Sequence, residues 1–166
     1  IIATDASKLV KNAPSKNLSW KSCQTLYFTA NKRVIEKPMI GLVSREDSLI
    51  NNIFYHTSVA THNNNTEELL SVTIVKEHQL SEEQLIATVK KQLKEECHID
   101  TITFLEIYSI KRSLPDLKDI KYEVTPSETQ LSSGIFLAGD VQLNGSLNAA
   151  MIAGEKAALQ VIASHK

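Results

Sequence analysis

Alternating apolar and polar residues predict several β-strands in the first two thirds of the chain. Between Gln24 and Ala30, Leu26 and Phe28 share one face while threonine and tyrosine occupy the other, which is the period of a half-buried strand. Similar patterns mark four further strands: Pro38–Val43, Ile53–Ala60, Leu69–Val75 and Ile102–Lys111. Short connections join the first four strands of the series, so we expect an antiparallel meander.

A helix is predicted from about Glu82 to Cys97. Ser81 is a good N-cap and Gln84 follows three residues later, as in a capping box. Apolar residues then recur at helical spacing on one face, with most of the charged residues on the other. We expect this helix to cover one face of the sheet, and a helix that binds a partner is the alternative.

The last third of the chain has a different pattern. Ile135–Ala138 is an uninterrupted apolar run, typical of a strand buried on both faces, and Gly139 ends it. A final helix is predicted from roughly Ser146 to Ser164. Ile1–Thr4 is a similar apolar run at the other end of the chain. We expect these two short strands to be parallel neighbours in one sheet.

This strand, glycine turn and small-residue helix would suit an anionic or electron-rich ligand. Gly139 lets backbone approach a ligand closely, and Gly145 precedes helix amides that have no intrahelical partner. Ala150, Gly154 and Ala158 recur every four residues and give the helix a smooth face. The alternative is a strand and helix whose small residues only allow close packing. We also expect this face to be buried in a homodimer.

The composition is that of an ordinary globular protein, with 166 residues, 42% hydrophobic, 22% charged and a formal net charge of −1. This charge gives no reason to expect nucleic acid or an anionic membrane as a partner. No apolar run approaches the ~20 residues of a membrane span. Cys23, Cys97 and the histidines show no metal-ligand spacing. We therefore predict thiols in a reducing, cytoplasmic setting and no metal site.

Two stretches carry the most specific motif, GIFLAGD at residues 134–140 and NGSLNAAMIAGEKAA at 144–158. In this order they resemble the carboxyl-terminal FAD-binding motif of the flavin-containing amine oxidase and protoporphyrinogen oxidase superfamily. The resemblance implies a cofactor site made of Gly139, Asp140, Gly145, Ser146, Leu147 and Asn148. The aspartate would lie near the ribityl–pyrophosphate region, and the helix amino terminus would point at the pyrimidine edge of the flavin.

Weaker similarity extends along the rest of the chain and implies three segments. Residues 1–10 resemble the strand on which the family's chain leaves its FAD domain, 11–112 the substrate-binding domain, and 113–166 the carboxyl-terminal FAD-binding segment. The implied fold class is α+β: a mixed or antiparallel-sheet substrate-binding lobe covered by a helix, plus the strand–helix remnant of a Rossmann-like FAD-binding domain.

The family's amino-terminal G-x-G-x-x-G motif is absent, and the first residue is Ile1 within an expected strand. We therefore expect the carboxyl-terminal part of an FAD-dependent oxidoreductase, which oxidises a C–N or C–C bond of a small organic substrate by hydride transfer to flavin. On this interpretation a missing amino-terminal FAD domain is the partner, and the fragment alone is inactive and binds FAD weakly or not at all. The alternative is a non-enzymatic ligand-binding or protein-interaction domain with this fold.

The catalytic residues cannot be assigned from the sequence, although a few side chains are candidates for contact with the substrate or the flavin. Lys111 and Arg112 lie where the chain would return towards the flavin, or else are solvated strand ends. His56 either lines a substrate cavity or is a hydrogen-bonded structural histidine. Trp20, in a polar stretch, is interpreted as a packing residue.

Overall fold

The computed structural model describes residues 1–166 apart from 5, 7–8, 11–17, 60–65 and 166. The chain forms two compact units. Unit 1 combines Ile1–Lys21 with Arg112–Lys166, and unit 2 is Ser22–Lys111. Each unit has its own hydrophobic core.

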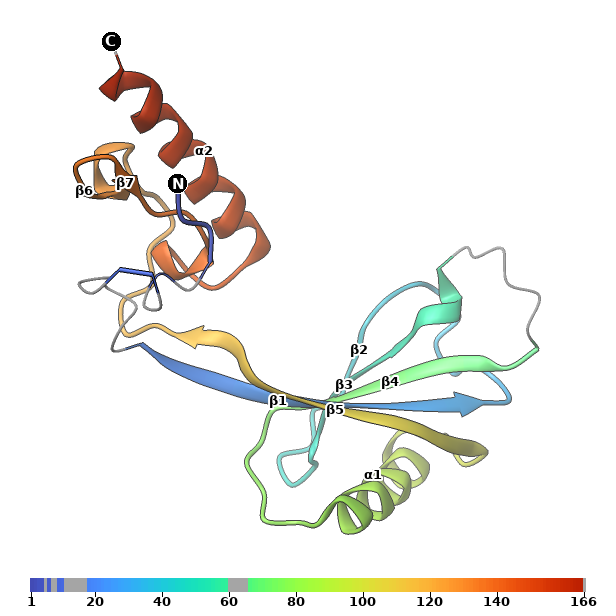
Figure 1. Cartoon of the computed structure of the whole chain (residues 1–166). Coiled ribbons are helices and arrows are strands. Elements are labelled where there is room, and N and C mark those ends of the chain that lie inside the picture. Colours follow the sequence, from blue (N-terminus) through green and yellow to red (C-terminus); the bar gives the residue numbers. More distant parts are fainter. Residues whose placement is uncertain (5, 7–8, 11–17, 60–65, 166) are drawn as a thin grey trace. The chain divides into compact units, whose positions relative to one another are not determined.

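Unit 2 is built on a five-stranded antiparallel sheet (Figure 1). Its strands are β1 (Ser19–Ala30), β2 (Gly41–Leu42), β3 (Ile50–Tyr55), β4 (Glu68–Ile74) and β5 (Ile102–Asp116). Their order across the sheet is β2-β3-β4-β1-β5. The first and last strands begin or end beyond the unit boundary, so the chain enters and leaves unit 2 along β1 and β5.

The expected meander is correct for β2, β3 and β4 and wrong for β1. Instead of pairing with β2, β1 lies between β4 and β5, with Leu26 opposite Val72 in the antiparallel register. The strand predicted over Pro38–Val43 is reduced to Gly41–Leu42. The strand expected over Ile53–Ala60 instead spans Ile50–Tyr55 and continues as the 3₁₀ turn η3 (His56–Ser58), while Ala60 lies outside the described residues.

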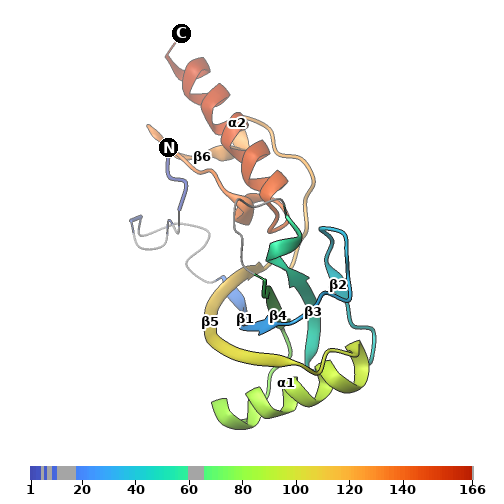
Figure 2. The same ribbon diagram turned by 90° about the vertical axis from the view of Figure 1, so that its right-hand side faces the viewer.

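The helix α1 (Glu82–Cys97) covers one face of this sheet, as expected (Figure 2). The side chain of Ser81 accepts a hydrogen bond from the Gln84 N–H, and the Gln84 side chain accepts one from the Ser81 N–H, which completes the capping box. The buried residues of α1 pack on apolar side chains of the strands, which include Leu26, Phe28, Leu70, Val72 and Ile74. Side chains alternate along a strand, so the other residues of each strand face the opposite side of the sheet, where the described residues of unit 2 form no covering helix.

Unit 1 contains the helix α2 (Leu147–Ser164) and the two-stranded sheet of β6 (Gln130–Ser132) and β7 (Ile135–Phe136). The predicted contact of the chain's first strand with residues 135–138 is confirmed as a parallel bridge between Ile2 and Leu137. The Ile2 N–H donates to the Phe136 carbonyl at 2.7 Å, and the Ala138 N–H donates to the Ile2 carbonyl at 2.9 Å. The two ends of the chain therefore meet in one unit.

The small-residue face of α2 is only partly covered by the chain itself. Ala149, Ala153 and Ala157 are buried; Ala149 packs with Leu143, and Ala157 with Phe136 and Ala138. A Cβ at Gly154 would meet no described atom within 4 Å. Close packing inside this chain therefore does not explain Gly154. No helix in the described part of the chain is long and apolar enough to cross a membrane.

Candidate functional site

A small cavity opens beyond the parallel bridge between Ile2 and Leu137, wholly within unit 1. Ala3 and Thr4 follow the bridge on one segment, and Gly139 and Asp140 follow it on the other. Both segments line a cavity of about 130 Å³. The carboxyl ends of neighbouring parallel strands are where α/β proteins place their ligands.

Gly139 forms part of the cavity wall in a conformation that other residues rarely adopt. Its φ is +122°, and a Cβ placed there would meet nothing within 4 Å. The glycine is therefore needed for the backbone angle, not for lack of space within the chain. The open space beside it leaves the backbone accessible to a ligand.

Asp140 has two separate roles in the geometry of the site. Its carbonyl accepts hydrogen bonds from the Leu143 N–H at 3.1 Å and the Gly145 N–H at 3.2 Å, closing the turn η5 (Asp140–Gln142). Asp140 is half-buried and is one of the residues that line the cavity. Its carboxylate makes no hydrogen bond or ion pair with the other described residues. The carboxylate is therefore available as an acceptor.

The Gly145 bond links this turn to the amino terminus of α2. Gly145 has φ +67°, and a Cβ there would lie 3.2 Å and 3.3 Å from Pro115 Cγ and Cδ. The Ser146 hydroxyl accepts from the Ala149 N–H at 3.1 Å and donates to Asn144 Oδ1 at 2.6 Å, so both of its hydrogen-bonding functions are used in capping. Leu147 and Asn148 lie on the exposed first turn of the helix.

The structure thus joins Asp140 to Gly145 through one backbone hydrogen bond. It also adds Trp20, which lines the same cavity although the sequence predicted only a packing role. The Arg112 guanidinium carbon lies 5.7 Å from the centre of the Trp20 ring, within cation–π range. No local signal marked Trp20, because its neighbours in the cavity are remote in sequence.

A second group of side chains lies on the uncovered face of the unit 2 sheet. The ring centroids of Tyr27 are 5.7 Å from His56 and 5.8 Å from Tyr108, and Phe54 is 5.0 Å from His56. His56 Nε2 is hydrogen-bonded to Ser71 Oγ at 3.0 Å. His56 therefore has the expected hydrogen bond, but it lies in η3 and not on a strand.

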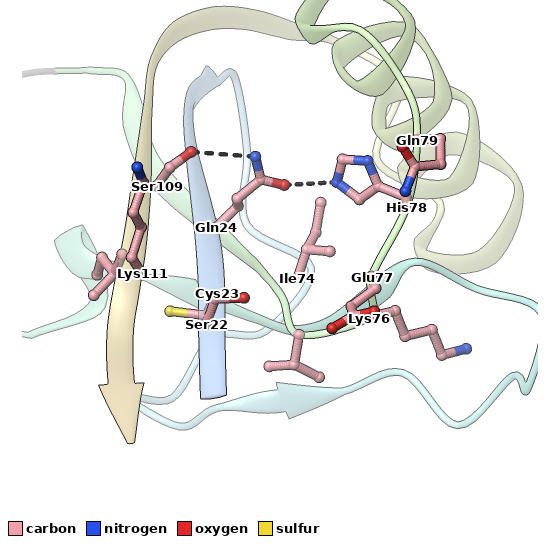
Figure 3. A pocket seen from close by; sticks show the side chains of 12 residues that line it. Ser22, Cys23, Gln24, Ile74, Lys76, Glu77, His78, Gln79, Ser109 and Lys111 are labelled. Carbon is pink, nitrogen blue, oxygen red and sulfur yellow. Dashed lines mark hydrogen bonds between the residues drawn. The ribbon is translucent and has the colours of Figure 1, made fainter. Parts of the chain in front are cut away.

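A larger cavity of about 340 Å³ lies within unit 2, between β1, β5 and the connection that follows β4. Figure 3 shows a chain of hydrogen bonds from Ser109 through Gln24 to His78. His78 Nδ1 accepts from the Leu80 N–H, so we assign the ring proton to Nε2, which donates to Gln24 Oε1 at 2.6 Å. The Gln24 amide then donates to Ser109 Oγ at 3.2 Å. These bonds hold the connection in place, and exposed Lys111 also lines the cavity.

Comparison with known proteins gives a likeness in structure only. No family model and no curated protein matches the chain. Among solved structures, the chain is similar to a "putative protoporphyrinogen oxidase" from Exiguobacterium sp. 255-15, with 16% sequence identity and a TM-score of 0.63 over 98% of this chain and 40% of that one. It is also similar to an oxidoreductase from Methanosarcina mazei, with 14% identity and a TM-score of 0.53 over 97% of this chain and 39% of that one.

At these identities the likeness concerns the fold. The chain spans about two fifths of the length of either protein. The order of its elements, from the bridge at Ile2 through the sheet of unit 2 to α2, is therefore an arrangement found within larger oxidoreductase structures.

Proposed function

We propose that this chain is the carboxyl-terminal part of an FAD-dependent oxidoreductase and supplies one portion of its FAD site. The observation that carries the proposal is the cavity beyond the Ile2–Leu137 bridge, lined by Gly139 and by Asp140, whose carboxylate makes no hydrogen bond or ion pair with the other described residues. The last four residues of the GIFLAGD motif line this cavity, and the likeness to oxidoreductase structures supports the same assignment.

The residues that line the cavity fit one portion of FAD. Sites that enclose a drug-sized ligand usually measure roughly 300–1,000 Å³, whereas this cavity measures about 130 Å³. It has room for a ribityl or phosphate portion but not for the complete dinucleotide. The bare backbone at Gly139 and the acceptor at Asp140 suit the hydroxyl groups of such a portion. The adenosine half requires residues outside this chain.

Each site residue then has a distinct task. The Asp140 carboxylate accepts a hydrogen bond from a cofactor hydroxyl, and Gly139 allows close approach. The first turn of α2, with Leu147 and Asn148, stabilises negative charge by about 0.3–2 kcal/mol, depending on burial. Ser146 holds that turn in place by capping it. Bound flavin would supply the redox chemistry by accepting a hydride equivalent from a C–N or C–C bond.

The substrate lobe in this proposal is unit 2. Its uncovered sheet face presents Tyr27, Phe54, His56 and Tyr108, a surface suited to a small organic substrate with an apolar or aromatic body. The chain alone is expected to be inactive and to retain FAD weakly or not at all. We also propose that the protein is cytoplasmic and forms a homodimer.

The test is flavin binding by the full-length protein and its Asp140 variants. Asp140→Ala should weaken FAD binding by about 1.5–3 kcal/mol, the usual size for a hydrogen bond to a charged group. That loss corresponds to a dissociation constant about 10- to 150-fold higher. Asp140→Asn retains an acceptor oxygen and should lose less. Flavin content is read from the visible absorption of the purified protein, and affinity from FAD titration of the apoprotein.

Glu155→Ala is the matched control, because it removes one carboxylate from the same unit at a side chain that is 67% exposed. It should leave the affinity unchanged. Equal FAD affinity in Asp140→Ala and the wild type would remove Asp140 from the site. A full-length protein that contains no flavin and binds none would refute the enzyme proposal.

One observation favours a protein-interaction domain as the second candidate function. Leu147, Met151 and Ile162 are 78%, 67% and 57% exposed and lie along one side of α2. Exposed apolar surface of this kind is typical of interaction sites. This candidate predicts a folded full-length protein that binds no flavin, so the same absorption measurement separates the two functions.

A further inference from the structure

A third cavity lies within unit 2, beside the carboxyl end of α1. It measures about 460 Å³, and one wall is the segment that leads through β2. Five of its eleven lining residues are aliphatic: Val34, Ile35, Leu42, Val43 and Ile53. The last turn of α1 contributes Glu95, Glu96 and Cys97, and Arg45 also lines the cavity. The cavity therefore combines an aliphatic wall with charged and polar groups.

Glu96 is the unusual residue of this pocket, because its side chain is only 6% exposed and its ion pair with Arg45 is a long one. Its Oε2 is buried and has no hydrogen-bond partner among the described residues. Its Oε1 lies 4.0 Å from Arg45 Nε, which is too far for a hydrogen bond. A buried carboxylate without a donor is costly, so such a group requires an explanation.

Arg45 does not supply the missing donor. Its guanidinium binds Asp47 through two hydrogen bonds, Nε to Oδ1 at 3.1 Å and Nη2 to Oδ2 at 2.9 Å. The Arg45 side chain is 59% exposed. The positive charge of Arg45 is therefore shared with the nearer carboxylate of Asp47 and screened by solvent. Glu96 Oε2 is left without a hydrogen-bond donor among the described residues.

The surroundings of Glu96 also favour a bound cation. The residue lies in the last turn of α1, where the carbonyl ends of the helix make the potential negative. Burial, and then the neighbouring Glu96 charge, raise the pKa of the Cys97 thiol, so this group stays neutral. A metal ion is a poor occupant, since the described residues include no group of three or more histidine, cysteine, aspartate or glutamate side chains that could hold one.

We propose that this pocket binds a small organic ammonium ion. Its N–H groups donate to the Glu96 carboxylate, and its alkyl body packs on the aliphatic wall formed by Ile35, Val43 and Ile53. The ammonium supplies donors and a positive charge, and the aliphatic wall favours an organic cation over a hydrated inorganic one. This second site goes beyond the proposed flavin function and lies on residues of unit 2 alone.

The test uses the full chain, labelled with ¹⁵N, and n-butylammonium as the probe. Titration should shift the backbone amide signals of Leu42, Val43 and Cys97. n-Butanol has the same alkyl body without the charge and should bind at least tenfold more weakly. Equal binding of the two probes would overturn the proposal, and this comparison needs no variant. The readout does not depend on flavin, so its failure is distinct from a failure of the flavin proposal.

Two glutamine variants locate the charge. Glu96→Gln keeps the side-chain shape and should weaken n-butylammonium binding at least tenfold. Glu83→Gln is the matched control, since it makes the same change at an exposed position in the first turn of the same helix and should leave binding unchanged. Unchanged binding in Glu96→Gln, or an equal loss in both variants, would overturn the assignment to Glu96.

Discussion

Substitution of Gly145 tests the geometry that links the Asp140 turn to α2. Gly145 has φ +67°, and an alanine Cβ there would approach Pro115 Cγ and Cδ to 3.2 Å and 3.3 Å. Pro115 is buried, so it has little room to move. The left-handed backbone alone costs a non-glycine residue about 1–2 kcal/mol. Gly145→Ala should therefore destabilise unit 1 by more than this conformational cost.

Gly134 provides the matched comparison. Its φ of +74° is nearly the same, but a Cβ there would meet nothing within 4 Å. Gly134→Ala should therefore lose only the conformational part. The difference between the two variants measures the contact with Pro115. In a double-mutant cycle, Pro115→Ala should recover part of the loss in Gly145→Ala and give a coupling energy of about 0.5 kcal/mol or more.

Trp20 is the one tryptophan of the chain; it lines the unit 1 cavity and lies near the start of β1, so its fluorescence reports unfolding at that cavity and at the first residues of the strand. Urea unfolding followed by Trp20 fluorescence gives the free energy of unfolding for each variant. Equal destabilisation by Gly134→Ala and Gly145→Ala, together with zero coupling to Pro115→Ala, would refute the steric argument. The result also bears on function: loss of flavin after substitution of Gly145 would follow from destabilisation alone, so Asp140 is the sharper test of cofactor contact.

Three further predictions concern single side chains. Ser81→Ala removes the acceptor of the Gln84 N–H and should destabilise α1 by about 0.5–2 kcal/mol; hydrogen exchange in the first turn of α1 should quicken, and unchanged exchange would contradict the capping role. Hydrogen bonds from the backbone and then the side chain of Thr125 lower the pKa of the Glu128 carboxyl. The ionised Glu128 carboxylate therefore stabilises the fold fully above the ordinary glutamate pKa, and this stabilisation is lost as the pH falls through the lowered pKa. Glu128→Gln should abolish this pH dependence in acid unfolding curves. Burial raises the pKa of the Cys97 thiol, so its alkylation by iodoacetamide, followed by mass spectrometry, should accelerate only at a pH above that of an ordinary thiol; rapid reaction near neutral pH would argue against this environment.

The sequence was sufficient where the determining interactions are local. The capping box of Ser81 and Gln84 and the spacing of Leu85, Val89 and Leu93 predict α1 with its bounds, because these residues lie within one helix. Alternation likewise places Leu26 and Phe28 on the buried face of β1. Sequence could not give the neighbours of β1, since alternation defines the faces of a strand and not which strand pairs with it. The insertion of β1 between β4 and β5 depends on contacts far apart in the chain.

The candidate site divides in the same way. The motif marks Gly139, Asp140 and Gly145 because their turn and helix are contiguous in sequence. Trp20 joins the cavity only through the fold, and nothing near it in the sequence marks it as a site residue. The buried carboxylate of Glu96 was likewise hidden, since a glutamate in the last turn of an amphipathic helix looks like an ordinary surface residue.

Unit 2 is a continuous stretch of chain inserted into a unit whose two parts are distant in sequence. Its first and last residues lie on β1 and β5, which are neighbours in the sheet, and Gln24 is hydrogen-bonded to Ser109 near this junction. Because its ends lie close together, the whole inserted lobe can be exchanged for another without re-routing the chain of unit 1. Such an arrangement allows the sheet face of unit 2 to diversify by replacement of one continuous segment, while the turn at Gly139–Asp140 remains unaltered.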